Sequence, residues 1–201
     1  WFVPVTPGTS YVTVAGAVAG DVHGKNHHVV GTFGDHVLGI RMMLGSGEIV
    51  TTSRTELPDL FYATCGGMGL TGMVLEVTIQ MVRIHSSLID QRTLKAETLD
   101  QSCEQFAQHG KPTYSVAWID CVTAGPSMGR SVLMLGEHAQ TGGLHIKLKK
   151  PPSIPFYTPA ALLNARTVGK FNQMYYARAR HQHKRKVSLM SFFYPLDAIG
   201  G

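Results

Sequence analysis

Five glycines fall within residues 16–34, and this density sets the first limit on the fold of the chain. Glycine reaches backbone conformations that other residues rarely adopt, and it weakens any helix or strand that contains it. We therefore expect residues 16–34 to form a loop whose backbone can come close to a ligand. The preceding residues Tyr11–Val14 are aromatic and β-branched, which predicts a strand leading into this loop.

The remainder of the first 84 residues is predicted to contain strands and one helix. Two apolar runs are separated by Gly45-Ser46-Gly47, which is typical of a hairpin turn. Pro58 and the neighbouring acid Asp59 suit the first turn of a helix. The expected elements are strands at residues 37–44, 48–52 and 72–84 and a helix at residues 57–64.

The pattern changes near residue 84 and indicates a second unit. We expect a helix at residues 98–109 and strands at residues 114–121, 131–135 and 187–194. Four prolines and a run of Arg, His and Lys predict a basic, mobile loop over residues 147–186. The sequence therefore predicts an α+β fold with two domains, residues 1–84 and residues 85–201.

Charge is distributed unevenly along the chain. The net charge is +5, but residues 1–137 carry 8 Lys or Arg against 12 Asp or Glu, whereas residues 138–201 carry 10 Lys or Arg and one acid, Asp197. The basic part should attract an anion such as a phosphate, a nucleic acid or a lipid headgroup.

The sequence has no run of about 18 apolar residues, so no transmembrane helix is predicted. Its three cysteines lack C-x-x-C spacing, which argues against a disulfide framework and a zinc ribbon.

The segment Gly20–His28 concentrates reactive side chains among glycines, and two interpretations of it are disfavoured. A phosphate-binding P-loop would need glycine where Ala19 stands and Ser or Thr where Asn26 stands. A metal site could use the three histidines of the segment, but the glycines oppose the helix that would bring two imidazoles to one face. We therefore expect no metal ion.

A third interpretation of the segment is a loop that lines a cofactor. Glycines let the backbone approach a flat ring system, and Lys25 or His23 would lie where negative charge develops during reduction of a flavin. A surface turn without a role in chemistry remains the alternative.

Three sequence runs around this loop carry a family pattern. They are P-G-T-S-Y-V-T-V-A-G at residues 7–16, H-G-K-N-H-H at residues 23–28 and G-G-M-G-L-T-G at residues 66–72. Together they resemble the vanillyl-alcohol-oxidase (PCMH-type) flavoproteins over residues 4–83, with weaker likeness in patches of residues 84–201. Within this superfamily, H-G-K-N-H-H is most similar to the decaprenylphosphoryl-β-D-ribose 2′-oxidase family. The resemblance implies that residues 1–84 are the C-terminal part of an FAD-binding domain and residues 85–201 a partial substrate (cap) domain.

The resemblance also implies roles for individual residues. His23 and Lys25 would be catalytic on the substrate side of the flavin ring, and Lys25 and Trp118 would contact the substrate. Met68 stands where relatives have Asn and Val116 where they have Ser, so the substrate itself stays open. The implied FAD contacts are Gly8, Thr13, Val14, Ala15, Gly16, His23, Gly24, Lys25, Asn26 and Val74.

The activity that the resemblance implies is oxidation of a secondary alcohol on a polyprenyl-phosphate sugar, with hydride transfer to FAD. One alternative is an aldonolactone or alditol oxidase of the same fold. Another is a nucleic-acid-binding protein, which would use the basic residues but leave the glycine-histidine loop unexplained. Because residues 147–186 combine cations with aromatic residues, peripheral contact with an anionic membrane is also considered. We expect a cytoplasmic or peripherally membrane-associated protein.

The ends of the sequence suggest an internal fragment, because the chain begins at Trp1 rather than Met. The resemblance places the family's first pyrophosphate-binding loop before Trp1 and a catalytic lysine after Gly201. The polypeptide alone is therefore expected to bind FAD poorly and to be inactive.

Overall fold

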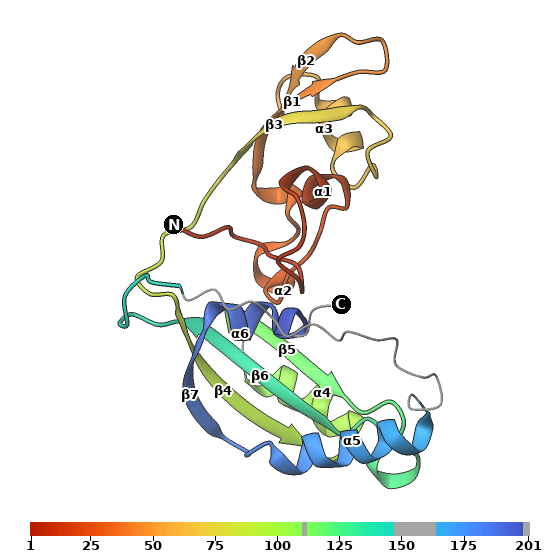
Figure 1. Cartoon of the computed structure of the whole chain (residues 1–201), viewed down its shortest axis with the longest axis vertical. Helices are drawn as coiled ribbons and strands as arrows, with labels where there is room; N and C mark the ends of the chain where they lie inside the picture. Colours follow the sequence, from red (N-terminus) through yellow and green to blue (C-terminus); the bar gives the residue numbers. More distant parts are fainter. Residues whose placement is uncertain (110–111, 147–163, 199–201) are drawn as a thin grey trace. The chain divides into compact units, whose positions relative to one another are not determined.

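The computed structural model describes residues 1–109, 112–146 and 164–198. The chain divides into two compact units, each built on its own antiparallel sheet (Figure 1). The first unit comprises Trp1–Ile84 together with Phe193–Asp197, and the second begins at His85. The sequence placed a boundary at residue 84 but did not anticipate that a segment more than 100 residues later belongs to the first unit.

The first unit has a three-stranded sheet with helices packed on it. The strands are β1 (Val37–Met43), β2 (Ile49–Thr52) and β3 (Met73–Ile79), in the order β2-β1-β3. Helix α1 (Val14–Ala19) packs near β3, and α3 (Pro58–Thr64) packs near β2. Apolar side chains from these elements form one core: Val5, Ala17, Val18, Phe33, Val37, Ile40, Met42 and Phe61.

Two expectations for the N-terminal part were wrong. Tyr11–Val14 is not a strand, because helix α1 begins at Val14 and the Thr13 hydroxyl caps it by accepting a hydrogen bond from Gly16 N at 3.0 Å. The main-chain N–H groups in the first turn of a helix have no acceptor within the helix, and a capping side chain supplies one, which favours a helix start at this position. The glycine-rich segment, residues 16–34, is also not a continuous loop, since residues 16–19 are the end of α1 and a short helix, α2 (His27–Val30), follows.

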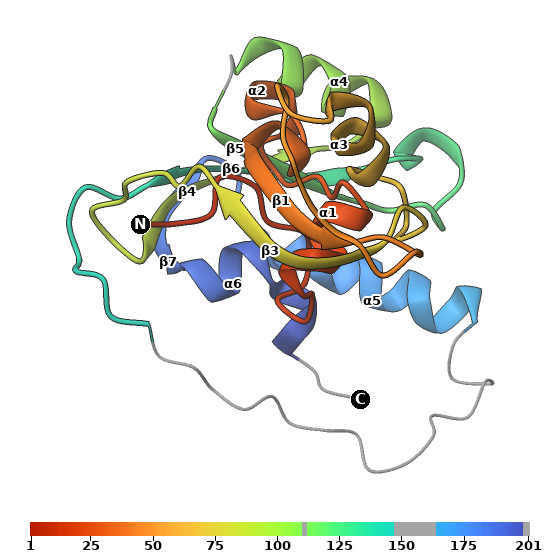
Figure 2. The ribbon, with the colours of Figure 1, turned by 90° about the horizontal axis from the view of Figure 1, so that it is seen from above.

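The second unit has a four-stranded antiparallel sheet in the order β5-β6-β4-β7. Figure 2 shows α4 on one side of this sheet and α5 and α6 on the other. Its strands are β4 (Leu88–Ala96), β5 (Tyr114–Ile119), β6 (Ser131–His138) and β7 (His183–Ser188). Its helices are α4 (Leu99–Gln108), α5 (Ala165–Arg178) and α6 (Leu189–Phe193).

Helix α4 covers an apolar face of this sheet. Leu94, Leu133 and Leu135 form a buried cluster, and Ala117 packs against it. The Ser102 and Ser131 hydroxyls meet in a buried hydrogen bond of 2.6 Å, which ties α4 to β6. The opposite face carries the functional candidates discussed below. The helices and strands of both units confirm the predicted α+β class.

The prediction of a basic, mobile loop over residues 147–186 was wrong for most of residues 164–186, the part that the structure describes. Residues 147–163 lie outside the described residues, but α5 and β7 occupy much of the remainder. Helix α5 is stabilised by a capping box between Asn164 and Thr167. Strand β7 lies at the edge of the sheet, where charged residues are common, so its sequence has no apolar alternation. The strand expected at residues 187–194 ends at Ser188, and β4 was not assigned from the sequence at all.

Candidate functional site

The loop at residues 23–26 is held tightly against the N-terminal segment of the first unit. A Cβ on Gly24 would lie 2.7 Å from the carbonyl oxygen of Thr6, so only glycine fits here. The next polar residue, Asn26, is 2% exposed, and its Nδ2 donates to the carbonyl oxygen of Pro4 at 2.7 Å. The amide of Asn26, expected to contact a cofactor, thus holds the loop in place.

Lys25 lies between these two anchors and is partly buried. Its Nζ donates to the carbonyl oxygen of Phe193 at 2.8 Å and lies 5.9 Å from the centre of the Phe193 ring. Burial lowers the pKa of Lys25 from its usual value, because the ammonium ion loses contact with water. The loop therefore presents a cation that is fixed in position and easier to deprotonate than an exposed lysine.

The histidines of the segment lie on its surface. His23 is exposed and forms an isolated antiparallel bridge with Thr32, and its ring centre lies 5.7 Å from that of His27. No cluster of three or more possible metal-binding side chains is found in residues 1–109, 112–146 and 164–198. His23 is therefore accessible to a ligand, whereas a metal centre gains no support from the described residues.

The segment at residues 8–16 is mostly exposed and leads into helix α1. A Cβ on Gly8 would meet no atom within 4 Å, so its surroundings are open. Gly16 lies against the capping hydroxyl of Thr13, at 3.1 Å from an added Cβ. The main-chain N–H groups of Val14 and Ala15, in the first turn, have no intrahelical acceptor. The segment can thus offer two main-chain donors to a bound ligand.

A carboxylate far along the sequence fixes this exposed segment. Asp197 accepts hydrogen bonds from the Thr9 hydroxyl at 2.6 Å, from Ser10 N at 2.7 Å and from the Ser10 hydroxyl at 2.6 Å. The hydrogen bonds from Ser10 and Thr9 hold the pKa of Asp197 below its usual value. Sequence reasoning did not select Asp197 as functional. The feature of the sequence that could have indicated it is that Asp197 is the single acidic residue among residues 138–201.

Two further predicted residues lie elsewhere in the two units. Val74 is on β3, where it pairs with Met42 and is packed against the core of the first unit. Because β3 is an edge strand, its outer main-chain groups are available to a ligand. Trp118 is on β5 of the second unit, and its ring centre lies 4.7 Å from that of Tyr175 on α5.

Similarity to known proteins identifies the first part of the chain. Residues 1–53 match the family model described as FAD binding domain. Decaprenylphosphoryl-beta-D-ribose oxidase of Mycolicibacterium smegmatis is 34% identical over 212 residues, which cover 99% of this chain and 46% of the relative. The chain carries part of an FAD-binding domain and is similar to this oxidase over nearly its whole length. Two other proteins match over shorter stretches.

Cytokinin dehydrogenase 8 of Oryza sativa subsp. japonica is 36% identical over 72 residues, or 35% of the chain and 13% of that protein. D-arabinono-1,4-lactone oxidase of Yarrowia lipolytica is 29% identical over 87 residues, or 43% of the chain and 16% of that protein. The chain spans less than half the length of the mycobacterial relative. The match of residues 1–53 to the FAD binding domain confirms the prediction that the cofactor is FAD.

The described residues fit FAD in three respects. The N–H groups at the start of α1 can donate to polar atoms of the cofactor, and the open surroundings of Gly8 leave room for it. Lys25 supplies a fixed positive charge, which suits a flavin that becomes negative on reduction. The contacts of individual residues with FAD remain predictions.

Proposed function

We propose that the protein oxidises a secondary alcohol of a sugar carried on a polyprenyl phosphate, with FAD as the oxidant. The observation that carries this proposal is the similarity to decaprenylphosphoryl-beta-D-ribose oxidase, which runs through both structural units. The lactone oxidase, by contrast, matches only 43% of the chain. The similarity therefore includes the unit that would recognise the substrate.

FAD, when bound, supplies the acceptor for the hydride that leaves the carbinol carbon. The residues of this chain would position the alcohol and stabilise charge. Lys25 is proposed to donate a hydrogen bond to the substrate hydroxyl or to the reduced cofactor, because an ammonium group is a donor of several hydrogen bonds and carries a positive charge. His23 is exposed on the same loop and can hold or move a proton. We assign orientation and charge stabilisation, rather than the role of general base, to these two residues.

Trp118 is our candidate for substrate contact in the second unit. Its indole packs against Tyr175 at 4.7 Å, and Tyr175 is stacked with Phe171 at 6.1 Å. An aromatic cluster of this kind offers an apolar surface to a sugar ring or to the first isoprene units of a lipid chain. Val116, on the same strand, gives no hydrogen bond from its side chain, which favours an apolar contact at that position.

Peripheral contact with a membrane belongs to the same proposal. No helix among the described residues is long and apolar enough to cross a membrane. On α5, however, Phe171 and Met174 are 57% and 59% exposed on a helix with no acidic residue. Exposed apolar side chains on a cationic helix favour binding to anionic lipid surfaces. Sedimentation with anionic vesicles tests this contact, and failure to co-sediment even at low salt would contradict it.

The visible spectrum of the purified full-length protein, before and after acid precipitation, tests the main proposal. We expect a flavin spectrum whose colour is released into the supernatant, which indicates non-covalent FAD. Colour that stays with the precipitate would favour the lactone or alditol oxidases, in which FAD is usually covalent. A colourless protein that does not take up added FAD would contradict both, and a dominant nucleic-acid absorbance would favour the nucleic-acid-binding alternative.

Turnover distinguishes the two substrate classes, lipid-linked sugars and free aldonolactones, directly. The full-length protein should reduce its flavin with a polyprenyl-phosphate pentose but not with a free aldonolactone. Reduction by the lactone alone would overturn the proposed substrate class while leaving the flavin chemistry intact.

A further inference from the structure

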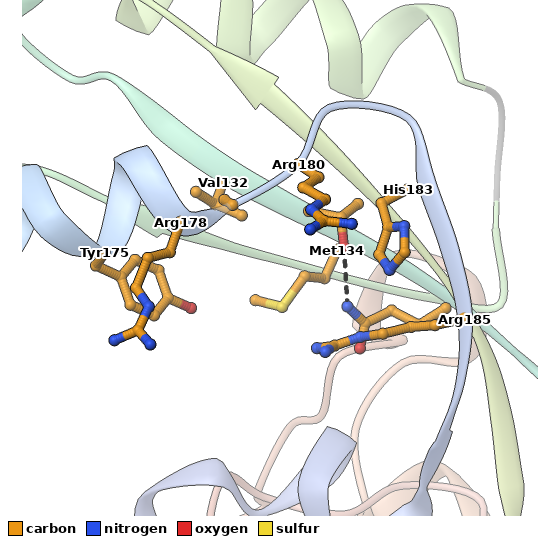
Figure 3. Close-up of a pocket in the computed structure, with 10 residues that line it drawn as sticks. Val132, Met134, Tyr175, Arg178, Arg180, His183 and Arg185 are labelled. Carbon is orange, nitrogen blue, oxygen red and sulfur yellow. Dashed lines mark hydrogen bonds between the residues drawn. The ribbon is translucent and has the colours of Figure 1, made fainter.

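The second unit contains an open pocket of about 380 Å³ on the sheet face that carries α5. Figure 3 shows Tyr175 and Arg178 on one side of Met134, and His183 and Arg185 on the other. A pocket of this volume is within the range of small-molecule sites. Its lining consists of Gln91, Thr93, Val132, Met134, Tyr175, Arg178, Ala179, Arg180, His183 and Arg185.

The register of the sheet explains why these residues meet. Thr93 on β4 pairs with Met134 on β6 and with His183 on β7, so the three side chains form one row across the sheet. Val132, two residues from Met134, pairs with Trp118 on β5. Paired residues project from the same face of a sheet. The pocket and the candidate substrate residue Trp118 therefore share one face.

The charged side chains that line the pocket in the described part of the chain are cationic. They include Arg178, Arg180 and Arg185, and none of the described lining residues is Asp or Glu. Among the described residues, none of these three arginines forms an ion pair with a carboxylate. Asp90 alternates with the pocket-lining residues of β4, so it projects from the other face, where its carboxylate lies 4.0 Å from Lys186. Three guanidinium groups without a protein anion form an attractive site for an anionic ligand.

The floor of the pocket adds neutral polar groups. Gln91 and Thr93 are buried, and Gln91 Nε2 donates to Thr93 Oγ1 at 3.0 Å. The hydroxyl of Thr93 accepts this bond and so keeps its own proton for donation to a ligand oxygen. The side chain of Met134 gives the centre of the pocket an apolar surface. A ligand with an anionic group and an apolar part would match both the arginines and the apolar surface of Met134.

We propose that this pocket binds the phosphate of a lipid-linked substrate through Arg178, Arg180 and Arg185. Guanidinium groups bind phosphate oxygens in pairs of parallel hydrogen bonds, which favours phosphate over a weakly charged ligand. The position on the face of Trp118 would let one unit hold the phosphate and contact the sugar. This inference rests on the proposed function for its lipid-linked substrate, whereas the anion site itself depends only on the geometry of the second unit.

Binding of farnesyl phosphate to the complete chain, measured by isothermal titration calorimetry, tests the proposal without flavin or turnover. The test variant is Arg178→Gln combined with Arg185→Gln. Two matched controls remove a positive charge from the same basic region. Arg166→Gln changes an arginine of α5 outside the pocket, and Lys184→Gln changes the residue of β7 that alternates with Arg185. Circular dichroism of each variant checks that the fold is retained.

The expected result is that wild-type chain binds farnesyl phosphate, and that the double variant loses at least about tenfold in affinity. The two controls should stay within about twofold, and farnesol should not bind. Equal affinity for the double variant and the wild type would overturn the site. Inorganic phosphate that binds as tightly as farnesyl phosphate would overturn the lipid assignment and leave a site for free phosphate. The visible spectrum of the full-length protein tests the proposed function separately from these binding data. A protein without flavin would contradict the proposed function, whereas the binding data test the anion site.

Discussion

Lys25 combines partial burial with a neutral hydrogen-bond acceptor, the carbonyl oxygen of Phe193. Such an environment keeps the ammonium in one place but stabilises its charge less than water does, which is why its pKa is lowered. A fixed lysine whose proton is more easily removed is suited to orient an alcohol and respond to charge on a cofactor. Lys25 is therefore the residue whose replacement says most about the proposed chemistry.

Lys25→Met in the full-length protein should slow flavin reduction by at least about 100-fold, because it removes the positioned cation. The FAD content should be unchanged, because the main-chain donors of α1 remain. Stopped-flow absorbance in the visible flavin band measures the rate, and the spectrum before mixing measures the FAD content. Lys170→Met, an exposed lysine of α5, serves as the control. Reduction at the wild-type rate in Lys25→Met would remove this residue from the mechanism.

Asp197 gives the first unit a stabilisation that depends on pH. Its folded-state pKa is below the usual value because Ser10 and Thr9 donate hydrogen bonds to the carboxylate. The contribution is therefore fully present above the usual carboxyl pKa of about 3.9 and is lost as pH falls through the lower folded-state value.

Asp197→Asn should lower the unfolding temperature of the first unit near neutral pH, and the difference from wild type should shrink as pH falls below the usual carboxyl range. Thermal unfolding between neutral and acidic pH measures both effects. Glu48→Gln changes an exposed carboxyl group of the same unit for which no side-chain hydrogen bond is described, so it should show neither effect. A difference for Asp197→Asn that is constant with pH would contradict the assignment.

At the scale of elements, helix α5 is attached to the sheet of the second unit through a buried carboxylate. Asp120 is fully buried and accepts a hydrogen bond from Asn172 Nδ2 on α5 at 2.7 Å. Burial alone would raise the pKa of Asp120, but hydrogen bonds from Thr123, Val122, Asn172 and Arg130 outweigh it and hold the pKa well below its usual range. Since Tyr175 and Arg178 of α5 line the pocket, this attachment also positions part of the proposed phosphate site.

Asn172→Ala should lower the free energy of unfolding of the second unit by about 2 kcal/mol, because a hydrogen bond to a buried charge is lost. Fluorescence of Trp118 during urea unfolding measures this, in a Trp1→Phe background, because the indole packs on Tyr175. Gln173→Ala, the exposed neighbour, should change the value by less than about 0.5 kcal/mol. Equal effects of the two substitutions would show that the bond to Asp120 does not attach the helix.

At the scale of the whole molecule, the described residues place a separate buried apolar cluster in each of the two units. Phe61 lies in the core of the first unit and Leu133 in that of the second, and each is 1% exposed. The residues of each cluster belong to a single unit, so we expect local stability to be set separately in each.

Phe61→Ala should destabilise the first unit by about 3–5 kcal/mol through loss of packing and formation of a cavity. Hydrogen exchange should then increase in β1 and β3 but not in β4 and β6. Leu133→Ala should give the reverse pattern, with a loss of about 2–5 kcal/mol in the second unit. Each variant is the control for the other, and faster exchange in both units from either substitution would indicate one cooperative unit.

Local signals in the sequence were sufficient for several elements and for the candidate loop. The hairpin of β1 and β2, helix α3 and helix α4 were predicted close to their observed bounds, since turn glycines and capping residues act within a few positions. The family pattern of H-G-K-N-H-H likewise depends on adjacent residues, and it pointed to Lys25 and to FAD.

Only the tertiary structure decided the features that depend on distant partners. Strand β7 exists because β4 pairs with it, although its own residues, which include His183 and Arg185, carry no apolar alternation. Asp197 contacts Ser10 across 187 positions of sequence. The arginine pocket likewise needs the register of β4, β6 and β7 together with the placement of α5. The sequence alone determined which residue types are available and where short elements start. Contacts between segments far apart in the chain determined which of those residues meet, because loop closure and packing act on the whole unit.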